Sequence, residues 1–205
     1  MDMTTRPCRE FLEALASGAP TPGGGGAAAL LGAAGAALGQ MVTNLTIGKK
    51  KYAPVEEEML SLRQELEEIR QKLLDLVEED EKAFAPLAAA YAIPKEQPDR
   101  AEILEKATLE ACRPPMEMME LLCRAVRCAA VLAEKGSRLA VSDAGCAAAF
   151  CRAALESASL NVFINTKTLR DREAAEELNR KAETMLDTFC PMAEGVFRQV
   201  RDSFR

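Results

Sequence analysis

Residues 23–44 read GGGGAAALLGAAGAALGQMVTN, a stretch without one charged side chain. Ala and Leu dominate it, and both residue types favour an α-helix. Four small residues fall on one face of that helix: Ala28, Gly32, Gly35 and Gly39. Because this face is nearly bare of side chains, another helix packs closely against it, within the chain or across a dimer axis. We therefore predict a central helix from residue 23 to about 47 in an all-α fold.

The turn before this helix reads Pro20-Thr21-Pro22, followed by four glycines. Thr21 and Pro22 fit an N-cap and a first-turn residue. A glycine-rich turn that leads into a helix presents free N–H groups and the positive end of the helix dipole, so it favours an anion. The alternative is a tight connection between two helices. The stretch lacks the Gly-Lys-Ser/Thr of a Walker A loop, and no strand precedes it as in a dinucleotide fingerprint.

The chain has 205 residues, enough for one domain with a sizeable core, and we see no domain boundary within 1–205. Apolar residues make up 48 %, but aromatics only 4 %, and β-branched residues are sparse. This composition is typical of closely packed helices rather than of a sheet. The net charge of −6 argues against a nucleic-acid partner.

The chain contains no histidine, which excludes Ser-His and Cys-His nucleophile pairs and His-based zinc sites. Acid–base chemistry must then rest on Asp, Glu, Lys, Tyr, Cys or water. The seven cysteines are odd in number and form no C-x-x-C pair, so we expect reduced, mostly buried thiols in a cytoplasmic protein.

No signal peptide is apparent, because Glu10 and Glu13 interrupt the first apolar stretch. The uncharged stretch from Ala14 to Gly48 raises the question of a membrane span. Its Gly and Ala contribute little to insertion, so we expect a buried helix and no membrane partner.

Hydrophobic periodicity and breaker residues predict further helices around the central one. Met59, Leu62 and Leu66 begin a helical pattern that continues along a Glu-rich stretch. Arg113-Pro114-Pro115 is expected to break or bend the fourth helix, and Pro86 to kink the third. The expected ranges are about 6–17, 55–91, 98–112 continuing as 116–135, 143–166 and 171–202.

Three polar clusters are candidates for chemistry. The first is the basic run Lys49, Lys50 and Lys51, which is either a solvated loop or the holder of an anionic ligand tail. The second is Asp80, which shares a helix face with Val77 and Phe84. Asp80 is either one solvated acid among many or a carboxylate beside the apolar stripe with a shifted pKa.

The third cluster lies on the predicted 143–166 helix. Ser142 or Asp143 fits its N-cap, whereas Asn161 and Asn165 share one face in an apolar stretch and need partners if buried. Asp143 and Asn161 are 18 residues apart, about 27 Å along a helix, so they cannot both touch one small group in the same copy. A shared site would need an elongated ligand or a second subunit.

Several segments together resemble the cyclodeaminase/cyclohydrolase family, which comprises methenyltetrahydrofolate cyclohydrolases and the cyclodeaminase part of formiminotransferase-cyclodeaminases. The matching segments span residues 11–166: FLEALASGAPTPGGG, MVTNLTIGKKKY, DEKAF, AIPK, and SDAGCAAAF through LNVFIN. One departure is Gly26, where many members have Ser.

The resemblance implies a homodimeric all-α bundle of long antiparallel helices that binds folate, with no metal and no cofactor beyond the tetrahydrofolate substrate. It implies hydrolysis of 5,10-methenyltetrahydrofolate to 10-formyltetrahydrofolate or, alternatively, cyclisation of 5-formiminotetrahydrofolate with release of ammonia. The absence of a formiminotransferase domain from the chain favours the first. A separate formiminotransferase or formyltetrahydrofolate synthetase would be a partner. A non-catalytic helical folate binder or assembly partner is a third alternative.

The family's Asp-x-x-Ala-Phe pattern selects Asp80 as the residue at the one-carbon centre, with Asp143 as the next candidate. We expect the remaining site residues to bind the substrate: Thr21, Gly23, Gly24, Gly25, Lys49, Lys50, Lys51, Ser142, Asn161 and Asn165.

Overall fold

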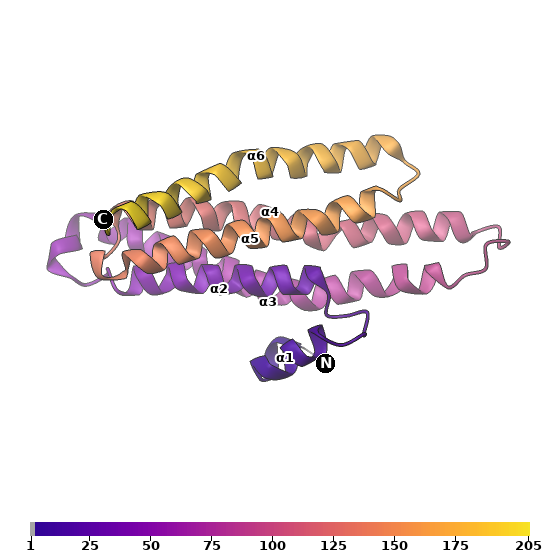
Figure 1. The fold of residues 1–205 in the computed structure, drawn as a ribbon, viewed down its shortest axis with the longest axis horizontal. Coiled ribbons are helices and arrows are strands. Elements are labelled where there is room, and N and C mark those ends of the chain that lie inside the picture. Colours follow the sequence, from indigo (N-terminus) through magenta and orange to yellow (C-terminus); the bar gives the residue numbers. More distant parts are fainter. Residues whose placement is uncertain (1–2) are drawn as a thin grey trace.

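A computed structural model describes residues 3–205, and every regular element in this range is helical. The long helices lie side by side in an elongated bundle, with a short helix below them (Figure 1). The α-helices are α1 (Cys8–Leu15), α2 (Gly24–Asn44), α3 (Glu56–Tyr91), α4 (Arg100–Lys135), α5 (Val141–Thr166) and α6 (Arg172–Asp202). Short 3₁₀ turns cover Met3–Thr5, Lys50–Val55 and Arg138–Ala140. The prediction of an all-α fold is confirmed.

The small-residue face of α2 packs inside the chain. A Cβ added at Gly32 would lie 2.6 Å from Leu122 Cδ2, and one added at Gly35 would lie 2.7 Å from Cys151 Sγ. Ala28, Gly32, Gly35 and Gly39 are all buried. Of the two roles that the sequence left open for this face, the structure assigns the one within the chain. The outward side of α2 is also uncharged, and Met41 and Leu45 are exposed there.

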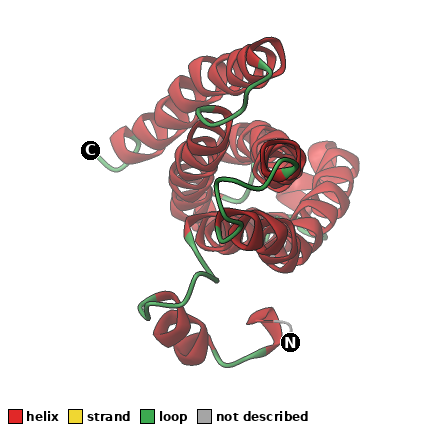
Figure 2. Ribbon diagram, turned by 90° about the vertical axis from the view of Figure 1, so that its right-hand side faces the viewer, coloured by secondary structure: helices red, strands yellow, loops and turns green. Residues whose placement is uncertain are grey.

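Helix α1 stands apart from the bundle, connected to α2 by the loop that contains the glycine turn (Figure 2). It is shorter than the predicted 6–17 and buries Phe11, whereas Leu12 is exposed. An apolar groove of about 490 Å³ lies between α1 and the adjoining surfaces of α2 and α3.

Helix α4 is one continuous helix through Pro114 and Pro115, so of the predicted break or bend at this point the break is wrong. Both prolines are buried, and buried residues lie on either side of them along α4. Burial of this apolar surface stabilises the helix by more than the prolines destabilise it. Helix α3 likewise continues through Pro86.

The N-cap predicted at Ser142 or Asp143 is wrong. Helix α5 begins at Val141, its N-cap position is Ala140, and no side chain caps it. The 3₁₀ turn Arg138–Ala140 leads directly into α5 and places Ser142 and Asp143 inside its first turn. Helix α6, in contrast, has a side-chain cap, since Asp171 accepts a hydrogen bond of 3.0 Å from the backbone N–H of Ala174.

Two helical segments, Gly24–Asn44 and Arg138–Thr166, are long and apolar enough to cross a membrane by length and composition. In the structure they pack against each other and against α3, α4 and α6. About half of each apolar stretch is buried within the fold, in agreement with the buried helix expected for α2 from the sequence.

Candidate active site

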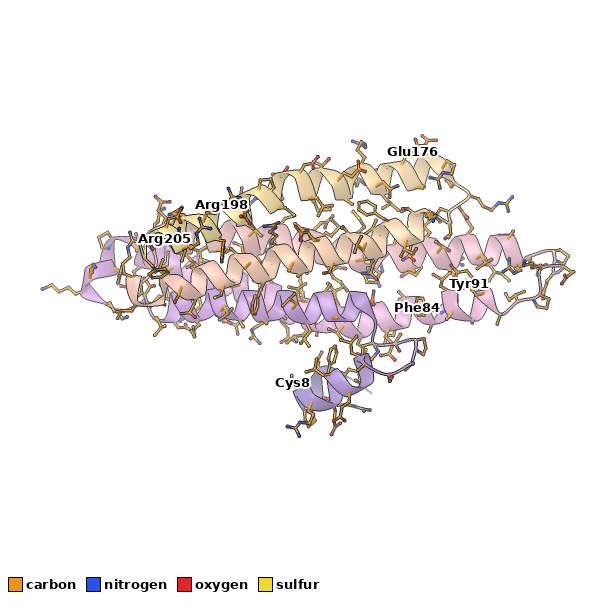
Figure 3. The ribbon with its side chains drawn as sticks, viewed as in Figure 1. Cys8, Phe84, Tyr91, Glu176, Arg198 and Arg205 are labelled. Carbon is orange, nitrogen blue, oxygen red and sulfur yellow. The ribbon has the colours of Figure 1, made fainter. Side chains whose placement is uncertain are left out.

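A cavity of about 210 Å³ opens where α2 begins, between α3, α4 and α5. It gathers residues from four separate parts of the chain. Its walls are formed by Pro20, Thr21, Gly23, Gly24, Gly25, Asp80, Phe84, Ala111, Asn161, Ile164 and Asn165. Seven of the predicted site residues therefore meet at one place, together with Pro20 and Phe84 from the segments that carry them. Phe84 on α3 lies beside the start of α2 and marks this end of the bundle in Figure 3.

Asp80 is the only carboxylate in the wall of this cavity. Burial raises the pKa of its side chain from 3.8 to about 6, although the backbone N–H of Gly26 donates to the carboxylate and lowers the pKa. Desolvation thus outweighs the hydrogen bond at the helix start. A carboxyl group with a pKa near 6 exchanges protons readily at neutral pH, as acid–base catalysis requires.

The glycine turn approaches Asp80 closely. A Cβ added at Gly25 would lie 2.6 Å from Asp80 Cγ, nearer than any real side-chain carbon approaches. At Gly24 the nearest atoms are those of the Asn161 amide, at 3.7 Å, which is ordinary contact. Close approach, rather than a positive φ, is therefore the reason for glycine at position 25. Among residues 3–205, Gly48 alone has a positive φ, of 76°.

Thr21 does not cap α2, contrary to the expectation from the sequence. The N-cap is Gly23, and no side chain caps this helix. The Thr21 hydroxyl instead donates a hydrogen bond of 3.0 Å to Glu81 Oε1, which ties the loop before α2 to α3. In the first turn of α2 it is the Asp80 carboxylate, from α3, that accepts from a backbone N–H, that of Gly26.

Both asparagines direct one amide N–H to a backbone carbonyl. Asn161 Nδ2 donates to Ser157 O at 2.9 Å on the same helix, and Asn165 Nδ2 donates to Ala111 O at 3.0 Å on α4. These bonds fix the two amide groups and leave each amide oxygen and second N–H for another partner. The partners that the sequence required are thereby identified.

The structure places the other predicted site residues at the opposite end of the bundle. Lys49 Nζ lies 3.5 Å from Ser137 Oγ, next to the start of α5, whereas the cavity lies at its far end. Helix α2 separates the two ends by 21 residues, about 30 Å. In a single copy of the chain, five candidates therefore lie apart from Asp80: Lys49, Lys50, Lys51, Ser142 and Asp143. A shared site would need an elongated ligand or a second subunit, as the sequence predicts for Asp143 and Asn161.

The wall residues missed by sequence reasoning are Ala111 and Ile164. Ile164 follows from its place between the two asparagines. The only sequence signal for Ala111 is Pro115, four residues later. A proline has no backbone N–H, so the carbonyl of Ala111 lacks its helical hydrogen bond and needs another donor.

Several of the seven cysteine thiols are held in environments that lower their reactivity. Burial raises the pKa of the Cys112 and Cys190 thiols to about 11 and that of the Cys123 thiol to about 12, so these thiols are poor nucleophiles at neutral pH. No group of three His, Cys, Asp or Glu side chains suited to a metal ion occurs within residues 3–205.

Comparison with known proteins identifies the family. Residues 7–184 match the family model described as formiminotransferase-cyclodeaminase. The chain belongs to this family. The resemblance inferred from the sequence is thereby confirmed.

Relatives of the formiminotransferase-cyclodeaminase family carry two activities in their names. A methenyltetrahydrofolate cyclohydrolase of Methylorubrum extorquens is 41 % identical over 93 % of this chain and 94 % of its own length. The mouse formimidoyltransferase-cyclodeaminase is 29 % identical over 87 % of this chain, which corresponds to 34 % of the mouse protein. The crystal structure of a formiminotetrahydrofolate cyclodeaminase from Thermotoga maritima superimposes with a TM-score of 0.86 at 31 % identity, over 97 % of this chain and 96 % of that one.

Proposed function

We propose that this chain hydrolyses 5,10-methenyltetrahydrofolate to 10-formyltetrahydrofolate in the cavity at the start of α2. The observation that carries the proposal is the partly buried Asp80 carboxylate, held against the glycine turn and flanked by two fixed amides. The identity of 41 % to a methenyltetrahydrofolate cyclohydrolase, over nearly the full length of both chains, supports this reaction.

The methenyl compound is a cation, so a carboxylate beside its one-carbon unit stabilises it electrostatically. In the reaction, the oxygen of water bonds to the methenyl carbon and the bond from that carbon to N5 breaks. One proton of the water ends on N5, and the other is released. We assign Asp80 as the acceptor of the proton that leaves the attacking water, and Asn161 and Asn165 as groups that orient the substrate.

The cyclodeaminase reaction is the second candidate, and the Thermotoga maritima structure favours it. There N10 attacks the formimino carbon, and the departing ammonia needs a proton from a general acid. With a pKa of about 6, Asp80 is protonated in roughly one molecule in ten at pH 7, so it can supply that proton.

The deciding experiment assays both substrates with the wild-type protein and with Asp80→Asn. We expect Asp80→Asn to lower kcat by at least ~100-fold, the usual loss for one acid–base or charge-stabilising group. Glu79→Gln is the matched control, because Glu79 lies one residue away and pairs with Arg113 outside the cavity. Unchanged turnover in Asp80→Asn on both substrates, or no turnover of either by the wild type, refutes the proposal.

The pH profile separates the two reactions. Hydrolysis needs the ionised Asp80, so kcat/KM should rise with pH and level off above about 6. Ammonia release needs the protonated form, so kcat/KM should fall as pH increases through the same value. Either limb should vanish in Asp80→Asn once the uncatalysed rate is subtracted.

We further propose that the chain forms a homodimer, that each copy is a bundle of long antiparallel helices, and that it acts in the cytoplasm with no cofactor beyond the tetrahydrofolate substrate. The uncharged outward side of α2, where Met41 and Leu45 are exposed, supports a contact between copies. A separate formiminotransferase or formyltetrahydrofolate synthetase would supply or share its folate. A monomer in light scattering at micromolar concentration would refute the dimer.

A further inference from the structure

Two adjacent prolines lie inside α4, and each removes one helical hydrogen bond. Pro114 leaves the carbonyl of Glu110 without its N–H partner, and Pro115 does the same to the carbonyl of Ala111. Glu110 is exposed, so water reaches its backbone. Ala111 is buried, and a buried carbonyl without a partner destabilises the fold.

The Ala111 carbonyl is taken by a side chain of the cavity. Asn165 Nδ2, on α5, donates to it at 3.0 Å, and both residues line the cavity that contains Asp80. An ordinary residue at position 115 would direct its own backbone N–H to this carbonyl. The proline therefore creates the acceptor that holds the Asn165 amide in place.

We propose that Pro115 is a positioning residue: by vacating the Ala111 carbonyl, it fixes the Asn165 amide with its oxygen and second N–H available to the substrate. The effect on turnover rests on the proposed function, whereas the position of the amide does not. Pro115, which the sequence marks only as part of a helix breaker, thus serves the site through a second helix.

The first test observes the Asn165 side-chain amide by NMR in the wild-type protein. One of its two protons should exchange more slowly than the other, because it is donated to a buried carbonyl. Equal, fast exchange of both protons overturns the proposal, whatever the variants do. In Pro115→Ala, which returns a backbone N–H to the Ala111 carbonyl, this protection should fall by at least ~5-fold. Unchanged protection overturns the proposal as well.

The second test is a double-mutant cycle on kcat/KM. Loss of one positioned hydrogen bond predicts a decrease of about 5-fold in Pro115→Ala. In the Asn165→Ala background the same substitution should change kcat/KM by less than ~1.5-fold, since the group it acts through is gone. An equal effect in both backgrounds would show that Pro115 acts only on the helix.

Pro114→Ala is the matched control, because it relieves the same helix of a buried proline but restores a partner to an exposed carbonyl. It should leave both the Asn165 amide signals and kcat/KM within ~1.5-fold of the wild type. A change equal to that of Pro115→Ala overturns the proposal. If the wild type turns over neither folate substrate, the proposed function fails, and the amide measurement still decides the role of Pro115.

Discussion

Replacing Gly25 with Ala tests the geometry of the cavity most directly. The new Cβ would lie 2.6 Å from Asp80 Cγ, against an ordinary contact of about 3.5 Å, so the carboxylate must move by about 1 Å. The Asp80 side chain is short and can swing away, so the fold should survive. Ala also favours a helix over Gly by about 1 kcal/mol, which offsets part of the strain.

The displacement removes the carboxylate from the position that it occupies beside the Gly26 N–H. A misplacement of about 1 Å at a reacting group can cost on the order of 100-fold in rate, so we expect kcat of Gly25→Ala to fall by ~100-fold. The melting temperature should change by no more than a few degrees. Steady-state assays on both folate substrates, together with thermal unfolding, measure the two effects.

Gly26→Ala is the neighbouring comparison. A Cβ at this position would meet Pro22 Cβ at 3.5 Å and Val77 Cγ1 at 3.6 Å, both ordinary contacts, and the backbone N–H remains. Its loss of kcat should stay below ~5-fold. If Gly25→Ala keeps a third or more of the wild-type kcat, or if Gly26→Ala loses as much, close approach to Asp80 is not what position 25 provides.

Three further predictions follow from the separation of the two ends and from the pKa of Asp80. Replacing Lys49, Lys50 and Lys51 by Gln should weaken the binding of polyglutamylated folate more than that of folate monoglutamate, and added salt should reduce this difference. Equal losses of affinity for both forms in binding titrations would contradict a role in binding the glutamate tail. Asp143→Asn should lower kcat by less than ~3-fold in the same assay, because Asp143 does not line the cavity. The raised pKa of Asp80 predicts stability that is present below pH 4 and lost as pH rises to about 6. In denaturant unfolding, the free energy of unfolding of the wild type minus that of Asp80→Asn should decrease by about 1–2 kcal/mol over this pH range, after allowance for partial exposure. A difference that does not change with pH would refute the raised pKa.

Local patterns in the sequence predicted much of the fold. Helix α2 was expected over 23–47 and runs from Gly24 to Asn44, because its composition and its small-residue spacing point the same way. Asp80 was expected beside the apolar stripe, and in the structure Val77 is buried and Phe84 lines the same cavity. Spacing along one helix determines these relations, so they need no knowledge of the rest of the fold.

Features that depend on packing between helices were not predictable in this way. Pro114 and Pro115 carry a strong local signal for a break, but α4 continues because its buried surface holds it in place. The cap signature at Ser142 and Asp143 failed because a 3₁₀ turn starts the helix two residues earlier. The separation of the lysines from the glycine turn, in contrast, follows from the length of the central helix, which the sequence does predict.

The electrostatics of Asp80 explain why one residue suits either reaction of the family. Two effects oppose each other there: burial favours the neutral acid, and the Gly26 N–H at the start of α2 favours the carboxylate. Burial dominates, and the pKa settles at about 6 rather than near the ordinary 3.8 or far above neutrality. A deeper site would keep the acid neutral and unable to stabilise a cation, whereas an open one would leave it fully ionised and unable to protonate ammonia. The glycine at position 25 sets this balance, since it lets the helix start approach the carboxylate closely enough to bury it and to donate a hydrogen bond to it.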